Sequence, residues 1–171
     1  MKPLACLLLL LAWPTPARSQ VDSSTPQQVS LSTFTGATLG HLTLGISTPE
    51  EARQALDTLG GLGPKRDNAV TFTVGGRTMR PRLLYTPPAT SNQLYFDRNV
   101  LVLLVEGSPR ETAGTVEAFK TRYPAARETQ RQPGWYEMQV QLAPCVWLIA
   151  VFGTADDALQ SDGYAYTCRP R

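Results

Sequence analysis

Twice along this chain, a proline-initiated amphipathic segment precedes segments in which apolar and polar residues alternate. Residues 48–51 read Thr-Pro-Glu-Glu, and residues 108–111 read Ser-Pro-Arg-Glu. A hydroxyl side chain at the N-cap, proline at the first helical position and glutamate at the third are typical of a helix start. The pattern predicts two helices, one near 49–59 and one near 109–122.

The alternating segments predict antiparallel strands. In residues 70–74, Val70, Phe72 and Val74 alternate with threonines, Gly75-Gly76 forms a two-residue turn, and residues 78–85 return as the second strand of a hairpin. Further strands are expected at 94–96, 100–105, 136–142, 145–152 and 164–168.

Each expected helix has one apolar stripe, and each alternating strand has one apolar side. Helices laid on one face of a sheet bury both kinds of apolar surface. The sequence therefore predicts an α+β fold, an antiparallel sheet with two helices packed on one face, built as two related α-β-β units. We expect one such domain at 29–171, preceded by a flexible N-terminal segment at 20–28.

Residues 1–19 have the pattern of a signal peptide. Lys2 precedes an apolar run at 4–13, and Ala17-Arg18-Ser19 is a small-x-small cleavage site. The run has about ten residues, whereas about 20 are needed to span a bilayer. We expect export to the periplasm or the exterior, cleavage near Ser19-Gln20 and no transmembrane segment.

The cysteines fit an oxidising compartment. Cys6 lies within the expected signal peptide, where only five residues precede it and most of the apolar run follows it, which argues against lipidation. Cys145 and Cys168 remain and are expected to form a disulfide, which would contribute about 3 kcal/mol to stability in the chain-entropy model. Two buried thiols and a redox pair are the alternatives.

The charges and the histidine content exclude several functions. Lys2 and Arg18 account for the whole excess of 16 basic over 14 acidic residues, so no excess remains after cleavage to bind nucleic acid. His41 is the only histidine, and no Gly-x-Ser-x-Gly motif accompanies it. Asp156, Asp157 and Asp162 do not have EF-hand spacing. No catalytic residue, metal site or cofactor is predicted.

The candidate partner-binding residues are arginines and aromatics. Arg77, Arg80 and Arg82 form the densest basic cluster; strand geometry predicts that Arg80 and Arg82 share a face and that Arg77 lies on the other, unless Pro81 introduces a bulge. A solvated edge that discourages aggregation is the alternative explanation. The candidates are Arg80, Arg82, Tyr85, Tyr95, Trp135, Tyr164 and Tyr166.

Residues 42–52, Leu-Thr-Leu-Gly-Ile-Ser-Thr-Pro-Glu-Glu-Ala, open the first expected helix. This stretch resembles the start of the first helix in small exported α+β domains of the BamE/SmpA type and of the β-lactamase-inhibitor-like group. The resemblance implies a non-catalytic binding role, and members of the first group are usually lipoproteins that assist envelope assembly.

These observations predict an exported binding protein that is not an enzyme. Its partner is expected to be another protein of the cell envelope or outside the cell, with the chain acting as an envelope-associated accessory or scaffold protein. A secreted inhibitor or sequestering protein is the alternative, and a small periplasmic hydrolase is the second alternative.

Overall fold

The computed structural model describes residues 42–57, 60–88, 92–106 and 114–169. The predicted signal peptide at 1–19, the predicted flexible segment at 20–28, His41 and the predicted cap at 108–111 lie outside these ranges. The helices are α2 (Pro49–Ala55) and α3 (Val116–Arg122). The strands are β1 (Lys65–Asp67), β2 (Phe72–Val74), β3 (Arg77–Met79), β4 (Leu83–Tyr85), β5 (Gln93–Asp97), β6 (Val100–Glu106), β7 (Arg127–Gln132), β8 (Trp135–Ala143), β9 (Val146–Gly153) and β10 (Leu159–Tyr166).

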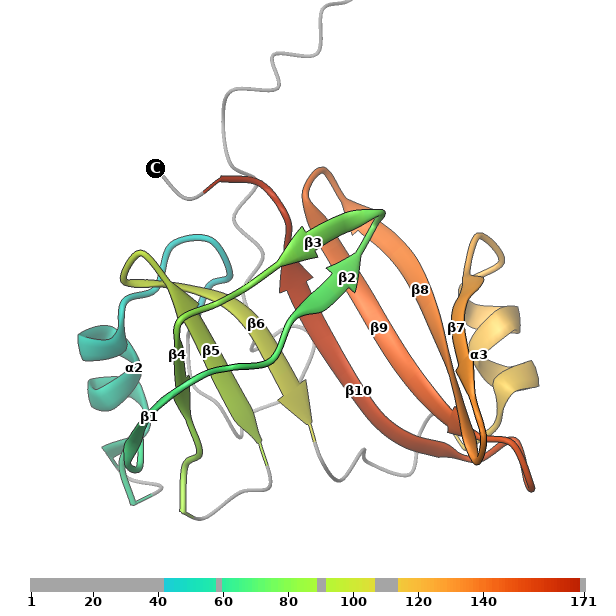
Figure 1. The fold of residues 1–171 in the computed structure, drawn as a ribbon, viewed down its shortest axis with the longest axis horizontal. Coiled ribbons are helices and arrows are strands. Elements are labelled where there is room, and N and C mark those ends of the chain that lie inside the picture. Colours follow the sequence, from blue (N-terminus) through green and yellow to red (C-terminus); the bar gives the residue numbers. More distant parts are fainter. Residues whose placement is uncertain (1–41, 58–59, 89–91, 107–113, 170–171) are drawn as a thin grey trace, which may run out of the picture.

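The described chain is mostly β (Figure 1). Eight strands form one antiparallel sheet in the order β1-β4-β5-β6-β10-β9-β8-β7, and β2 and β3 form a separate two-stranded sheet. The α+β prediction, with two helices packed on one face, is therefore wrong. Each of the two α-helices has only seven residues, and Figure 1 shows them at opposite ends of the large sheet.

The prediction of two related α-β-β units is also wrong. One half of the large sheet contains β1, β4, β5 and β6, and the other contains β7 to β10, so each half supplies four strands. The halves meet where β6 pairs with β10. The two outermost strands, β1 and β7, consist entirely of exposed residues. Because neither strand has a buried side, its sequence lacks the alternation of apolar and polar residues that indicates a strand.

Both described helices are shorter than predicted. Thr48 caps α2 through a capping box with Glu51, as the sequence indicates, but α2 ends at Ala55 and Leu56 is the C-cap. Helix α3 begins at Val116, and the Thr115 hydroxyl before it accepts a hydrogen bond from the Ala118 amide, 3.3 Å away. A good capping sequence thus locates the start of α2 but does not set its length.

The main hydrophobic core lies on one face of the large sheet. Strand residues Leu94, Leu104 and Phe152 are completely buried there, and Ala52 of α2 and Phe119 of α3 belong to the same cluster. Among the described residues, no helix is long and apolar enough to cross a membrane.

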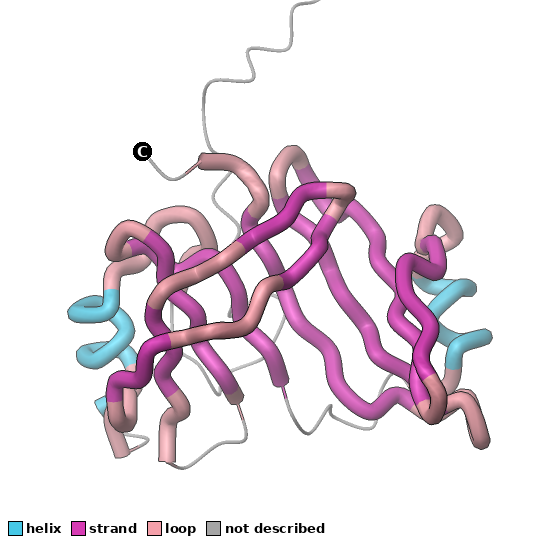
Figure 2. Tube along the Cα trace, in the orientation of Figure 1, coloured by secondary structure: helices cyan, strands magenta, loops and turns pink. Residues whose placement is uncertain are grey.

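The opposite face, which we call the hairpin face, is crossed by the β2–β3 hairpin (Figure 2). The predicted hairpin at Gly75-Gly76 is present, but its second strand is Arg77–Met79 and not residues 78–85, because Leu83–Tyr85 form β4 of the large sheet. Gly75 and Gly76 have φ values of 56° and 73°, as a tight turn between twisted strands requires. Val74 of this hairpin is buried in a second cluster with Tyr95 and Leu103.

The Gln139 side chain of the large sheet forms hydrogen bonds to the backbone of the hairpin turn. The Gln139 amide on β8 accepts a hydrogen bond from the Gly75 amide at 2.9 Å and donates one to the Thr73 carbonyl at 2.7 Å. Gln139 is only 3% exposed, so this polar group is buried with its partners. No described strand pairs with the hairpin on this side, and the Gln139 side chain satisfies two of its backbone groups instead.

We predict that Gln139→Ala lowers the free energy of unfolding by about 2 kcal/mol, because it leaves two hairpin backbone groups without partners. Urea unfolding followed by circular dichroism measures the loss. Gln141→Ala is the control, since Gln141 is exposed two residues along the same strand, and it should change stability by less than about 0.5 kcal/mol. Equal effects of the two variants would contradict the role given to Gln139.

Candidate functional site

A pocket of about 260 Å³ lies where β3, the β5–β6 turn and the C-terminal end of β10 meet. Four arginines from these three segments line it: Arg77, Arg80, Arg98 and Arg169. Asp97 is the one carboxylate among the lining residues. We call this site the arginine pocket.

Two of these arginines come from β3 and the residue directly after it. Arg77 begins the strand and Met79 ends it, so Arg80 and Pro81 already lie outside strand geometry. Strict alternation therefore does not apply to Arg80, and both Arg77 and Arg80 reach the pocket. Of the basic cluster at Arg77, Arg80 and Arg82, the first two line the pocket and Arg82 does not, although all three side chains are exposed.

Arg98 comes from the turn between β5 and β6. This residue and Asn99 have φ values of 49° and 63°, the left-handed region that glycine and asparagine usually occupy in such turns. An arginine in this conformation costs about 1 kcal/mol relative to ordinary backbone. The two-residue turn between Asp97 and Val100 requires this conformation, and it places Arg98 among the residues that line the pocket.

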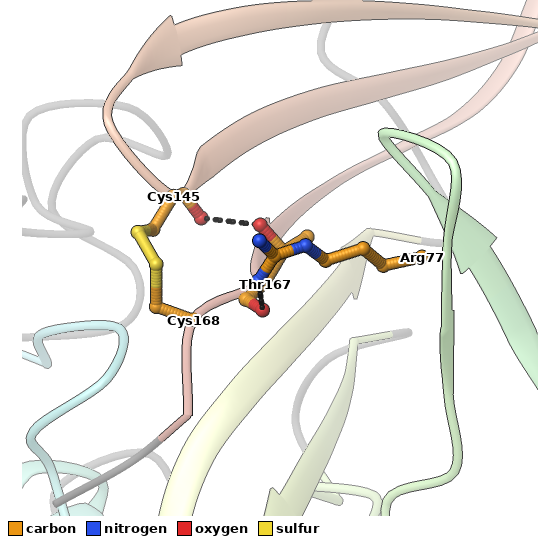
Figure 3. The surroundings of a disulfide bond; sticks show 4 residues. All are labelled: Arg77, Cys145, Thr167 and Cys168. Atoms are coloured by element: carbon orange, nitrogen blue, oxygen red, sulfur yellow. Dashed lines mark hydrogen bonds between the residues drawn. A yellow bond between two sulfur atoms is a disulfide. The ribbon is translucent and has the colours of Figure 1, made fainter.

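The disulfide supports the wall formed by the end of β10 (Figure 3). Cys145 and Cys168 are bonded as predicted, with their Cα atoms 5.2 Å apart. The Thr167 amide donates to the Cys145 carbonyl at 2.8 Å, and Arg77 Nη1 donates to the Thr167 carbonyl at 3.2 Å. This chain of contacts connects the disulfide to an arginine of the pocket.

Carboxylates neutralise little of the positive charge of the pocket arginines. Within the described ranges, salt bridges join Arg53 to Glu50 and Arg131 to Glu128, and none involves an arginine of the pocket. Arg80 Nε donates instead to the hydroxyl of Thr71, 3.3 Å away. An arginine side chain stays protonated at any physiological pH. The site is therefore a concentration of positive charge on a chain whose overall charge is small.

Four of the aromatic candidates are buried and serve mainly as packing residues, and of these only Tyr166 also lines the arginine pocket. Tyr85, Tyr164 and Tyr166 belong to the main core, with exposed fractions of 6%, 6% and 5%. Tyr95 lies under the hairpin, where its ring meets Phe72 edge-on at 5.0 Å. Trp135 is half-buried at the start of β8.

Of the four arginines that line the pocket, Arg77 and Arg80 belong to the basic cluster noted in the sequence, whereas sequence reasoning missed Arg98 and Arg169. These two lie in a turn and after the last strand, far from the basic cluster in sequence. No spacing signal connects such positions, because only the antiparallel pairing of β6 with β10 brings them to one edge.

A second cluster of ionisable groups lies at the other end of β6 and β10. Asp162 is directly opposite Glu106 in the strand register. Burial raises the pKa of the Asp162 carboxyl above its ordinary value, while hydrogen bonding with Glu106 partly opposes this shift. Burial likewise raises the pKa of the neighbouring Tyr164 hydroxyl. Burial therefore disfavours the ionised form of the Asp162 carboxyl.

The aspartates considered for calcium have structural roles. The Tyr136 hydroxyl donates to Asp157 Oδ1 at 2.8 Å, and Asp156 Oδ1 accepts from the Ala158 amide at 3.1 Å. In the part of the chain that the structure describes, no group of three histidine, cysteine or acidic residues is placed to hold a metal ion.

Compared with known protein families, with curated proteins and with solved structures, the chain matches none of them.

We predict that the double variant Cys145→Ser/Cys168→Ser unfolds with a free energy about 3 kcal/mol lower than the native chain, because its unfolded state gains the freedom that the disulfide removes. For a chain of this size the melting temperature should fall by roughly 6–12 °C. Thermal unfolding by circular dichroism measures the difference. The same double variant with added dithiothreitol is the control and should not shift further; an unchanged melting temperature in the variant would contradict the prediction.

Proposed function

We propose that this protein is an exported, non-catalytic binding protein that holds an anionic group of its partner in the arginine pocket. The observation that carries the proposal is the convergence of four arginines from three separate chain segments on one pocket, without an ion pair to any of them in the described ranges. Arginine is well suited to this task because its planar fork of N–H donors matches carboxylate and phosphate oxygens.

The arginine side chains favour binding over catalysis. Because they remain protonated, they hold an anion without accepting a proton from it. The disulfide next to Thr167 and the turn at Arg98 fix the backbone on two sides of the pocket. A pocket whose walls are fixed before binding loses less conformational entropy when it captures its ligand.

Export is supported by the pattern of residues 1–19 and by the disulfide, since disulfides persist in oxidising compartments. Within such a compartment we propose an envelope-associated accessory or scaffold role. The resemblance of residues 42–52 to small exported binding domains agrees with this role. The alternative is a secreted protein that inhibits or sequesters a soluble target.

We predict that the protein purified from its native cells begins near Gln20 and is recovered with the envelope fraction, because the leader is cleaved and the partner belongs to the envelope. Intact-mass analysis gives the N-terminus, and immunoblotting of envelope, soluble and medium fractions gives the distribution. Recovery in the medium alone would favour the secreted alternative, and a mass that retains Met1 would contradict export.

We predict that the pocket variant Arg80→Gln/Arg98→Gln reduces recovery with the envelope fraction at least fivefold, because two of the four cationic side chains of the pocket are lost. The matched control is Lys65→Gln/Arg66→Gln, which removes the same charge from exposed residues of the edge strand β1. The control should retain native recovery to within twofold. Equal losses in both variants would show an effect of total charge and would refute the pocket as the binding site.

A further inference from the structure

We infer that the anionic group accepted by the arginine pocket is the phosphate of an organic phosphate ester. This inference rests on the proposed function and names its ligand class.

The directions from which the arginines come favour a tetrahedral group. Arg77 lies at the start of β3, Arg98 lies in the β5–β6 turn, and Arg169 follows β10. A carboxylate is planar, and its two oxygens are satisfied by one or two guanidinium forks. A phosphate ester has three terminal oxygens pointing in different directions, so it can engage arginines from several sides at once.

The balance of charge favours a dianion. The lining contains four arginines against the single carboxylate of Asp97. A phosphate monoester carries a charge of about −1.5 to −2 at neutral pH, whereas a carboxylate carries only one negative charge. The phosphate therefore offsets more of the excess positive charge. This attraction is strongest where the cations have no ion pair with a carboxylate.

The size and the remaining lining of the pocket indicate an ester and not free phosphate. The pocket has a volume of about 260 Å³, whereas roughly 10–15 Å³ of such volume is enough to hold one water, so there is room for more than a phosphate group. Met79, Pro81, Val102 and Tyr166 supply apolar wall beside the arginines. Carbon atoms attached to the phosphate can therefore contact an apolar surface while the oxygens face the guanidinium groups.

A β-bulge shapes this apolar wall. The register of β5 with β6 pairs Tyr95 with Leu103 and Phe96 with Leu101, which leaves Val102 as the extra residue. Bulges redirect side chains and occur often beside binding sites. Val102 is 3% exposed and lines the pocket, so the bulge contributes an apolar contact at its base.

The test uses the mature, disulfide-bonded chain and isothermal titration calorimetry with three probes: glycerol 3-phosphate, glycerate and inorganic phosphate. We expect glycerol 3-phosphate to bind one site at least tenfold more tightly than glycerate, its carboxylate analogue, and more tightly than inorganic phosphate. Affinity should fall as the salt concentration rises. Equal affinity for glycerol 3-phosphate and glycerate would overturn the inference.

The variants locate the binding. Arg80→Gln/Arg98→Gln should weaken glycerol 3-phosphate binding at least tenfold, and the matched control Lys65→Gln/Arg66→Gln should stay within twofold of the native affinity. Circular dichroism confirms that each variant is folded, and Arg98→Gln alone serves if the double variant is not. Unchanged affinity in the folded pocket variant would overturn the inference.

A vesicle arm separates the two sources of a phosphate ester. Sedimentation with phosphatidylcholine vesicles that contain phosphatidic acid, but not with phosphatidylcholine alone, identifies a lipid headgroup. Binding of glycerol 3-phosphate without vesicle binding identifies a soluble ester. Absence of binding in both arms overturns the inference; if envelope recovery still depends on the pocket arginines, the proposed function stands with a different anion, and if it does not, both fail.

Discussion

The antiparallel pairing of β6 with β10 is the contact on which the rest of the structure depends. It joins two four-stranded halves into one sheet, in a register that runs from Asp162 opposite Glu106 to Ala165 opposite Leu103. Because the strands are antiparallel, the end of β10 lies beside the beginning of β6. The turn before β6 carries Arg98, and the segment after β10 carries Arg169, so the same pairing that completes the core also assembles the arginine pocket.

The β2–β3 hairpin has two roles at once. Its apolar side chains cover the hairpin face over Tyr95 and Leu103, and Gln139 secures its backbone to β8. The first residue of β3, Arg77, and the residue that follows the strand, Arg80, both line the pocket. Stability of the hairpin and integrity of the proposed binding site are therefore physically connected, and the hydrogen bond from Arg77 to the Thr167 carbonyl extends that connection to the disulfide.

Sequence patterns predicted the elements whose signals are local. The Gly75-Gly76 turn, the Thr48 cap and the buried strand within 100–105 depend on neighbouring residues, and each is present. The overall fold class was wrong because strands β1 and β7 are polar on both faces and because a strong cap does not specify helix length. The tyrosines were ambiguous, since alternation shows that Tyr164 and Tyr166 share a face but does not show that this face is the core.

The sequence by itself determined the turn at Gly75-Gly76, the start of the first described helix and the pairing of Cys145 with Cys168. Those features follow from backbone preferences and from counting, which need no distant contacts. Only the tertiary structure decided that the large sheet has eight strands and that four arginines from three segments share one pocket. Strand order and register are set by long-range packing of apolar faces, and residues brought together in that way have no common signal along the chain.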